Sequence, residues 1–222
     1  MNRQIAIDGP AGAGKSTVAR AVAAKLHMNY MDTGAMYRAV AYAMGTRGID
    51  PKDRPAVEVA MDSLSLRVEY SGGEQRVLAD GQDVTPFLRT QEIAMGASAV
   101  ASVPKVRLRL VELQRETAEK YDVVMDGRDI GTYVLPQARA KFYITASSRV
   151  RAERRARELE AAGGKVDRQQ LEQEIIARDK ADMEREFAPL KCAEDAIYVD
   201  TSDMTAEQVV AFVSKKVEKI YG

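Results

Sequence analysis

Residues 9–17 run Gly9-Pro10-Ala11-Gly12-Ala13-Gly14-Lys15-Ser16-Thr17, and the fold class of the chain follows from them. They contain every fixed position of the motif G-x-x-x-x-G-K-[ST]. The apolar residues 5–8 indicate a short strand before the motif, and helix-forming sequence continues after it to Lys25. Strand, glycine-rich loop and helix in this order form the setting in which the motif binds nucleotide phosphates. The alternative, a chance glycine-rich turn, is opposed by the match along the whole motif.

Each part of this loop has a chemical reason. Glycines let backbone N–H groups turn inward around a phosphate without a clash of Cβ atoms. The helix that follows adds the partial positive charge of its N-terminus. Lys15 supplies a charge for the β- and γ-phosphates, and the Ser16 hydroxyl can ligate Mg²⁺. We therefore expect a nucleoside triphosphate on residues 9–17 and a metal ligand at Ser16.

The rest of the chain alternates short apolar runs with helical segments. Further strands are expected at residues 28–31, 122–126, 141–145 and 196–200. A capping box, Thr205-Ala206-Glu207-Gln208, opens the last helix. Short apolar strands separated by helices predict an α/β fold, with a five-stranded parallel sheet covered by helices on both faces.

Two regions interrupt this pattern. Residues 64–70 and 75–79 alternate apolar and polar side chains on either side of Ser71-Gly72-Gly73, which predicts a β-hairpin. Residues 63–101 are therefore expected to form a small α+β insertion. Residues 148–187 are rich in Arg and Glu, poor in large apolar residues and broken at Ala161-Ala162-Gly163-Gly164. We expect this arm to be helical, to project from the core and to move.

Composition excludes several classes of protein. The 33 Lys and Arg balance the 33 Asp and Glu, which argues against nucleic acid as a bulk partner. One cysteine and one histidine exclude an internal disulfide framework and a Cys/His zinc cluster. A histidine-based catalytic triad would have to use His27, near the end of a helix. No stretch approaches the roughly 18 apolar residues of a membrane span, and we expect a cytoplasmic protein without a signal sequence.

The phosphate loop alone does not identify the activity, because GTPases, motor ATPases and small-molecule kinases share it. The chain lacks an Asn-Lys-x-Asp stretch for guanine selection, and it is short for a motor or remodelling ATPase. The remaining class is a kinase that acts on a small substrate.

Two clusters bear on the acceptor of such a kinase. In residues 32–38, Thr33 can cap the next helix and Arg38 lies about one and a half turns inside it. In residues 125–131, Asp126 ends a buried strand, where a carboxylate can support Mg²⁺, and Arg128 and Asp129 follow on a glycine-flanked loop. The alternatives are a structural cap with a solvated arginine and a turn that uses Asp and Gly for their backbone tolerance.

Arginines on the charged arm form a third cluster. Two groups have spacings that place their members on one helix face: Arg151, Arg154 and Arg155, and then Arg178, Asp182 and Arg185. The planar guanidinium suits phosphate oxygens. A solvated, salt-bridged surface explains the first group equally well.

Taken together, these segments resemble the bacterial cytidylate kinases, nucleoside-monophosphate kinases that phosphorylate CMP and dCMP. The resemblance covers almost the whole chain. It rests on IAIDGPAGAGKST (5–17), DTGAMYRA (32–39), RTQEIA (89–94), VVMDGRDIGTYVLP (123–136), ARDKADMEREFAPL (177–190) and AEDAIYVDTS (193–202). Other nucleotide kinases share the loop, but not DGRDIG together with the long insertion before RTQE.

The resemblance implies a P-loop NTPase fold in three parts. The core takes residues 1–37, 103–147 and 181–222, a monophosphate-binding domain takes 38–102, and a lid takes 148–180. ATP is implied as the phosphoryl donor with Mg²⁺, and CMP and dCMP as the acceptors. A monomer is expected on separate grounds, because the sequence shows no long coiled-coil pattern and no apolar edge strand.

The resemblance also implies roles for individual residues. Arg38, Arg128 and Arg178 are expected to hold the CMP phosphate, and Ser98, Arg107 and Asp129 to read the cytosine edge. Asp182, with Arg178 and Arg185, is expected to hold the ribose hydroxyls. Arg151, Arg154 and Arg155 are expected to meet the ATP phosphates when the lid closes. The expected catalytic set is Lys15, Asp126, Arg128, Arg155 and Arg178. Thr33 stands where some family members have Ser and keeps the hydroxyl on the substrate side.

Two alternatives stay open on the sequence. One is a binding protein that uses ATP as a switch. The other is a kinase for another small molecule, such as shikimate or dephospho-coenzyme A.

Overall fold

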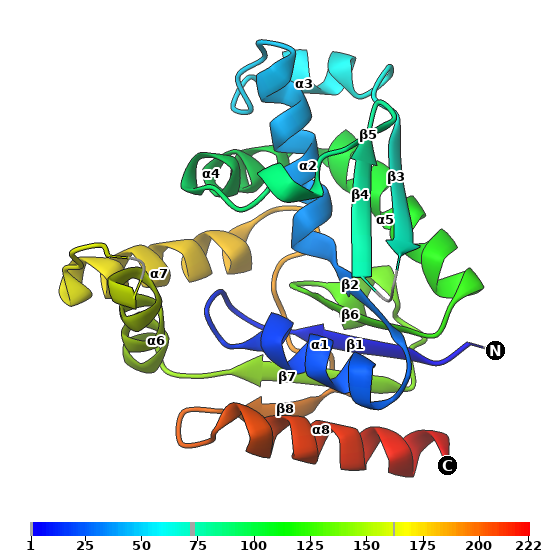
Figure 1. Ribbon diagram of the computed structural model, residues 1–222, viewed down its shortest axis with the longest axis vertical. Helices are drawn as coiled ribbons and strands as arrows, with labels where there is room; N and C mark the ends of the chain where they lie inside the picture. The colour runs from blue at the N-terminus through cyan, green and yellow to red at the C-terminus, as the bar shows by residue number, and fades with distance from the viewer. Residues whose placement is uncertain (1, 72–73, 162) are drawn as a thin grey trace. The chain divides into compact units, whose positions relative to one another are not determined.

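The computed structural model describes residues 2–71, 74–161 and 163–222 (Figure 1). Five strands form one sheet in the order β2-β6-β1-β7-β8. They are β1 (Gln4–Asp8), β2 (Asn29–Asp32), β6 (Val123–Gly127), β7 (Ala140–Thr145) and β8 (Ile197–Asp200). β7 pairs in parallel with β1 on one side and β8 on the other. The five-stranded parallel sheet expected from the apolar runs is confirmed, and no strand end differs from its expected position by more than one residue.

Eight helices accompany the strands in the described part of the chain. They are α1 (Lys15–Lys25), α2 (Thr33–Thr46), α3 (Arg54–Ala60), α4 (Gln91–Val100), α5 (Pro104–Lys120), α6 (Ser148–Ala161), α7 (Arg168–Glu184) and α8 (Ala206–Tyr221). A 3₁₀ turn, η1, spans Thr85–Phe87, and a π-helical turn, η2, spans Ile130–Val134.

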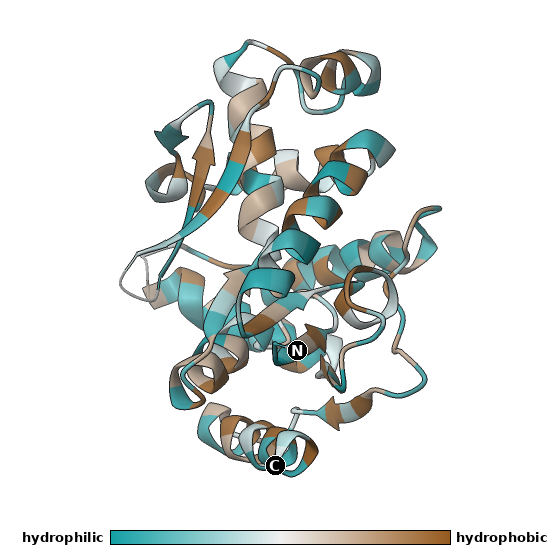
Figure 2. Cartoon of the chain, turned by 90° about the vertical axis from the view of Figure 1, so that its right-hand side faces the viewer, coloured by the Kyte–Doolittle hydropathy of each residue, from teal (hydrophilic) through white to brown (hydrophobic). Residues whose placement is uncertain are grey.

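The last helix, α8, forms where the sequence predicts a capped start, and it buries an apolar face. The Thr205 side chain accepts from the Gln208 backbone N–H, and the Gln208 side chain accepts from the Thr205 N–H, so the predicted capping box is confirmed. Val209, Val213 and Val217 recur every four residues and are buried. Figure 2 shows the resulting division of α8 into apolar and polar sides. With its buried valines, α8 packs against α1 and β7 of the same unit.

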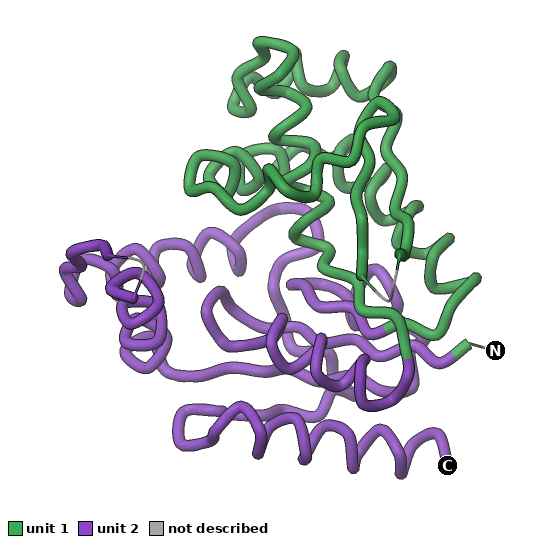
Figure 3. Tube along the Cα trace, viewed as in Figure 1, with its two compact units in different colours: residues 1–2, 28–123 green, residues 3–27, 124–222 purple. Residues whose placement is uncertain are grey.

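The chain divides into two compact units, which Figure 3 shows in different colours. Unit 1 holds residues 1–2 and 28–123, and unit 2 holds residues 3–27 and 124–222. We describe each unit by itself.

Unit 1 contains the expected hairpin. β3 (Leu66–Ser71) and β4 (Glu74–Ala79) pair antiparallel with Val68 opposite Val77. A short strand that the sequence did not indicate, β5 (Gln82–Asp83), extends this sheet to three strands. Gly72 and Gly73 of the predicted turn lie outside the described residues. The α+β character expected for residues 63–101 is confirmed by this sheet and α4.

Unit 2 contains the phosphate loop and the charged arm. In the arm, α6 and α7 pack against each other, and polar pairs join them: Ser148 donates to Glu172, and Arg168 pairs with Glu160. Only Ile175 and Asp179 of α7 are buried, so charge pairs and little apolar area hold these helices. Ala162, in the predicted break, lies outside the described residues. None of the helices described is both long and apolar enough to cross a bilayer.

Candidate active site

The phosphate loop starts where the sheet leaves no room for a side chain. Gly9 follows β1 directly, and its φ is +145°. A Cβ atom on Gly9 would lie 1.9 Å from the carbonyl oxygen of Ile144 in β7. Any larger residue would therefore push β1 and β7 apart. The strand–loop–helix order predicted for residues 5–25 is confirmed.

Lys15 is a buried cation in this loop. Its Nζ donates to the carbonyl oxygen of Pro10 at 2.8 Å. Burial and, to a lesser extent, the nearby charge of Arg128 together lower the pKa of Lys15 to about 7, against the opposing effect of Asp126 and Asp8. The loop thus keeps a lysine in a buried place, where the negative charge of bound phosphates would favour its charged form.

Ser16 and Asp126 form the candidate metal position. The Ser16 hydroxyl donates to Asp126 Oδ2 at 2.7 Å across 110 residues of sequence. Asp126 is buried at the carboxyl end of β6. No group of three or more His, Cys, Asp or Glu in the described ranges could hold a metal ion. A hydroxyl beside one carboxylate fits Mg²⁺, which in such sites takes most ligands from phosphates and water.

Asp8 is a site carboxylate that the sequence analysis missed. It is buried at the end of β1 and accepts from the backbone N–H groups of Ile130 at 2.8 Å and Gly131 at 2.7 Å. Burial raises the pKa of Asp8 to about 6. Asp8 therefore fixes the π-helical turn that follows Arg128 and Asp129. Its place at the carboxyl end of a strand, directly before the loop, was the available signal.

The loop after β6 is paired with α7 and the segment beyond it. Arg128 Nε donates to Asp182 Oδ2 at 2.7 Å, with both side chains about one fifth exposed. Asp129 is buried and lies 3.3 Å from Arg185 Nη2. Arg178 lies on the exposed side of α7. The structure thus brings together the donor loop and four of the residues expected for the acceptor.

One helix-face prediction is wrong. Arg185 was expected on the same helical face as Arg178 and Asp182, but α7 ends at Glu184 and Arg185 has an extended ψ of 139°. Pro189 follows shortly after, and a proline disfavours helix in the residue before it. The Arg185 Nε donates instead to the carbonyl oxygen of Ala188.

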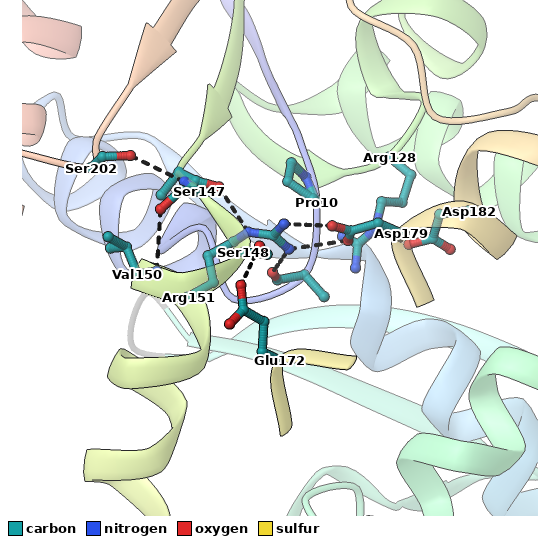
Figure 4. Close-up of polar contacts among 12 residues, drawn as sticks. Pro10, Arg128, Ser147, Ser148, Val150, Arg151, Glu172, Asp179, Asp182 and Ser202 are labelled. Carbon is teal, nitrogen blue, oxygen red and sulfur yellow. Dashed lines mark hydrogen bonds and ion pairs between the residues drawn. The ribbon is translucent and has the colours of Figure 1, made fainter. Parts of the chain in front are cut away.

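The three arginines of α6 have different surroundings, and Figure 4 shows Arg151 directed at Asp179. Arg151 is buried and forms a two-pronged ion pair with that carboxylate. Arg154 donates to Thr201, to the carbonyl oxygen at 2.7 Å and the hydroxyl at 3.2 Å. Arg155 is exposed and pairs with Glu158 at 2.8 Å.

In unit 1, the helix cap differs from the prediction. Asp32, and not Thr33, caps α2: its Oδ1 accepts from the Ala35 N–H at 2.9 Å, while Thr33 is already helical and buried. Asp is at least as good a cap as Thr, and Asp32 ends the preceding strand with the extended backbone that a cap needs. The Asp32 Oδ2 also binds Arg38 at 2.7 Å. Gly34 leaves space for this pair, because a Cβ there would lie 3.0 Å from Arg38 Nη1.

The other two expected base readers also lie in unit 1. Ser98 is exposed on α4. Arg107 is fully buried in α5, with its guanidinium carbon 5.7 Å from the centre of the Tyr37 ring. The face of the Tyr37 ring gives this buried charge a cation–π contact.

Comparison with known proteins decides the family. The family model described as cytidylate kinase matches residues 5–219. The chain belongs to the cytidylate kinase family. A cytidylate kinase from Caldicellulosiruptor bescii is 46% identical over 216 residues, which cover 97% of this chain and 96% of that protein. One from Desulforamulus reducens is 50% identical over 215 residues, covering 97% and 96%.

A solved structure agrees in fold. An uncharacterised protein from Eubacterium ventriosum superposes with a TM-score of 0.56 at 14% identity, covering 98% of this chain and 99% of that one. The resemblance drawn from the sequence motifs is thus confirmed at the level of the family, and the α/β fold with it.

Proposed function

We propose that this chain is a nucleoside-monophosphate kinase that transfers the γ-phosphoryl group of ATP to CMP or dCMP, giving ADP and CDP or dCDP. Membership of the cytidylate kinase family across residues 5–219 supports this activity. The observation that carries it in the structure is the phosphate loop: Gly9 turns against β7 where no Cβ fits, Lys15 is buried, and the Ser16 hydroxyl donates to Asp126 at 2.7 Å. Glycine-rich backbone, a lysine and a hydroxyl in this order form the type of site that binds nucleotide phosphates.

Phosphoryl transfer needs alignment and charge neutralisation more than a general base. Residues 9–17 would hold the ATP phosphates, and Lys15 would stabilise the charge on the group in flight. Arg128 and Arg178 would hold the acceptor phosphate in line, and Arg155 would add charge on lid closure. Ser16 would bind Mg²⁺ while Asp126 orients the Ser16 hydroxyl. The ion, when bound, neutralises charge on the donor phosphates.

The roles in base and sugar recognition are those that the family resemblance implies, and the chemistry of the side chains suits them. Cytosine offers an amine donor at position 4 and an acceptor nitrogen at position 3. Asp129 and Ser98 would accept from the amine, and Arg107 would donate to the ring nitrogen. Arg38 would hold the phosphate with Thr33 close by, and Asp182 with Arg185 would hold the ribose hydroxyls.

Three further features stay predictions. They are the division into a core, a monophosphate-binding domain at 38–102 and a lid at 148–180, the monomeric state, and the cytoplasmic location. Closure of the lid would exclude water, which otherwise competes with CMP as the acceptor.

A coupled assay of ADP release tests the proposal. CMP, dCMP, UMP, AMP and shikimate are offered separately with Mg²⁺ and ATP. We expect CMP and dCMP to be the best acceptors, and Lys15→Ala to lower kcat by at least about 10²-fold, the scale of one electrostatic stabiliser. ATP binding without turnover on any monophosphate would support the switch protein, and turnover on shikimate alone would support another kinase. A folded Lys15→Ala protein with near-normal turnover would overturn the role of the loop.

A further inference from the structure

Arg151 is bound on three sides by the protein. It lies near the start of α6 and is only 5% exposed. Its Nε donates to the carbonyl oxygen of Ala146 at 2.9 Å, and its Nη1 donates to the carbonyl oxygen of Ala11 at 2.9 Å. Nη1 and Nη2 both donate to the carboxylate of Asp179. The guanidinium therefore joins the end of β7, the phosphate loop and α7.

The contact with Ala11 lies inside the phosphate loop. The Arg151 Cβ also lies 3.4 Å from the position that a Cβ would occupy on Gly12, so the side chain packs along the loop. A shift of Arg151 therefore requires a shift of the loop backbone or the loss of a buried hydrogen bond, which is costly.

On the other side, α7 continues to the acceptor residues. Asp179 and Asp182 are three residues apart on α7, so they lie on neighbouring positions of one helix face. Asp182 binds Arg128 Nε at 2.7 Å. Figure 4 shows Arg151, Asp179, Asp182 and Arg128 in one view. Within unit 2, two sets of polar contacts are thus joined by one turn of α7: Arg151 binds the Ala11 carbonyl group and Asp179, and Asp182 binds Arg128.

We propose that Arg151 is a positioning residue that, with Asp179, couples the donor phosphate loop to the acceptor arginine Arg128 through α7. Occupation of the loop by ATP fixes the Ala11 carbonyl group, and this contact holds α7 where Asp182 orients Arg128. CMP then binds more tightly to the ATP-loaded enzyme than to the free enzyme, and by linkage ATP binds more tightly in the presence of CMP. The proposal rests on the proposed function, because it assigns Arg128 to the CMP phosphate.

The test measures this coupling directly. CMP is titrated by calorimetry without and with saturating Mg²⁺ and β,γ-methylene-ATP, and the ratio of the two Kd values is compared among variants. We expect a ratio above about fivefold in the wild type, the lower range of coupling between sites. In Arg151→Lys the ratio should fall to within about twofold of unity, since an ammonium cannot make all four contacts.

Two further variants keep the test decisive. A single substitution would leave one buried charge unpaired and can unfold a protein, so the double variant Arg151→Met, Asp179→Leu removes both charges together. This double variant should fold but show no coupling between ATP and CMP. Arg157→Lys is the matched control, since Arg157 lies on the same helix, is exposed and pairs only with Glu153 among the contacts described. It should keep the wild-type ratio.

Either of two results would overturn the coupling. One is a wild-type ratio near unity. The other is an Arg151→Lys protein that keeps the full ratio. If this protein also binds the ATP analogue weakly, Arg151 acts on the loop alone. Failure of the proposed function is a separate result, since it would appear as a wild-type enzyme that does not turn over CMP.

Discussion

The buried charge of Lys15 makes a quantitative prediction about protons. Lys15 has a pKa of about 7 in the ligand-free protein, against an ordinary value of 10.5. Bound phosphates supply the missing counter-charge and return the pKa toward its ordinary value. At pH 8 only about one tenth of the ligand-free molecules carry this proton, so ATP binding should take up about 0.9 proton per nucleotide; at pH 6 the uptake should be about 0.1. ATP affinity should therefore fall as the pH rises above 7.

Calorimetry in Hepes and in Tris, whose heats of ionisation differ, measures this uptake with Mg²⁺ and β,γ-methylene-ATP. Lys15→Met should abolish the uptake at pH 8. Lys25→Met, the same change at an exposed position in the last turn of the same helix, should leave it unchanged. Equal uptake by the wild type and Lys15→Met would refute the reasoning.

The sign of the stability effect follows from the same shift. Between pH 7 and 10.5 the unfolded chain keeps the Lys15 proton while the ligand-free folded protein has lost it. The free energy of unfolding should therefore rise with pH in this range, by at most about 1.4 kcal/mol per pH unit, relative to Lys15→Met. Chemical denaturation at pH 7, 8 and 9 measures the difference between the two proteins.

Three other predictions concern the acceptor and the lid. Gly34→Ala should raise the KM for CMP about fivefold, close to 1 kcal/mol, without changing the KM for ATP, because the new Cβ would displace the Arg38 guanidinium. An unchanged KM for CMP would remove Arg38 from the acceptor site. Asp129→Ala should lower kcat/KM for CMP more than for UMP, because a uracil carbonyl facing the Asp129 carboxylate already leaves two acceptors unpaired. Arg128→Ala should reduce kcat/KM for both about equally, and equal losses with Asp129→Ala would show that Asp129 does not read the base. Amide exchange in residues 148–180 should be fast in the free protein and slow when ATP analogue and CMP are both bound, and equal protection in both states would indicate a rigid arm.

The elements that could be predicted from the sequence are those with local signals. The phosphate loop, the five short apolar strands, the β3–β4 hairpin and the Thr205 capping box depend on spacing within a few residues. The long-range partners could not be predicted. In the sequence, Asp179 looks like an ordinary surface acid, and Asp8 is marked only by its place at the end of a strand before the loop. Only the fold brings Asp8 to the turn after β6 and Asp179 to Arg151.

The two local errors have physical causes as well. Thr33 follows an aspartate that competes for the same capping position, and the structure places the cap one residue earlier. Arg185 continues the helical spacing, but the chain leaves the helix ahead of Pro189. In both places the residue pattern is present, but a nearby residue decides the backbone: Asp32 at the start of α2, and Pro189 beyond the end of α7.

The contact between Gly9 and Ile144 has a consequence for evolution. Because the neighbouring strand forbids a side chain at Gly9, whether or not a nucleotide binds, selection for folding alone would retain this glycine. A descendant of this chain that had lost its catalytic activity would be expected to keep Gly9 and to be free to change Lys15, whose burial disfavours its charged form in the empty protein. Among such descendants, Lys15 is therefore the better marker of a working enzyme, and Gly9 is a marker of the sheet.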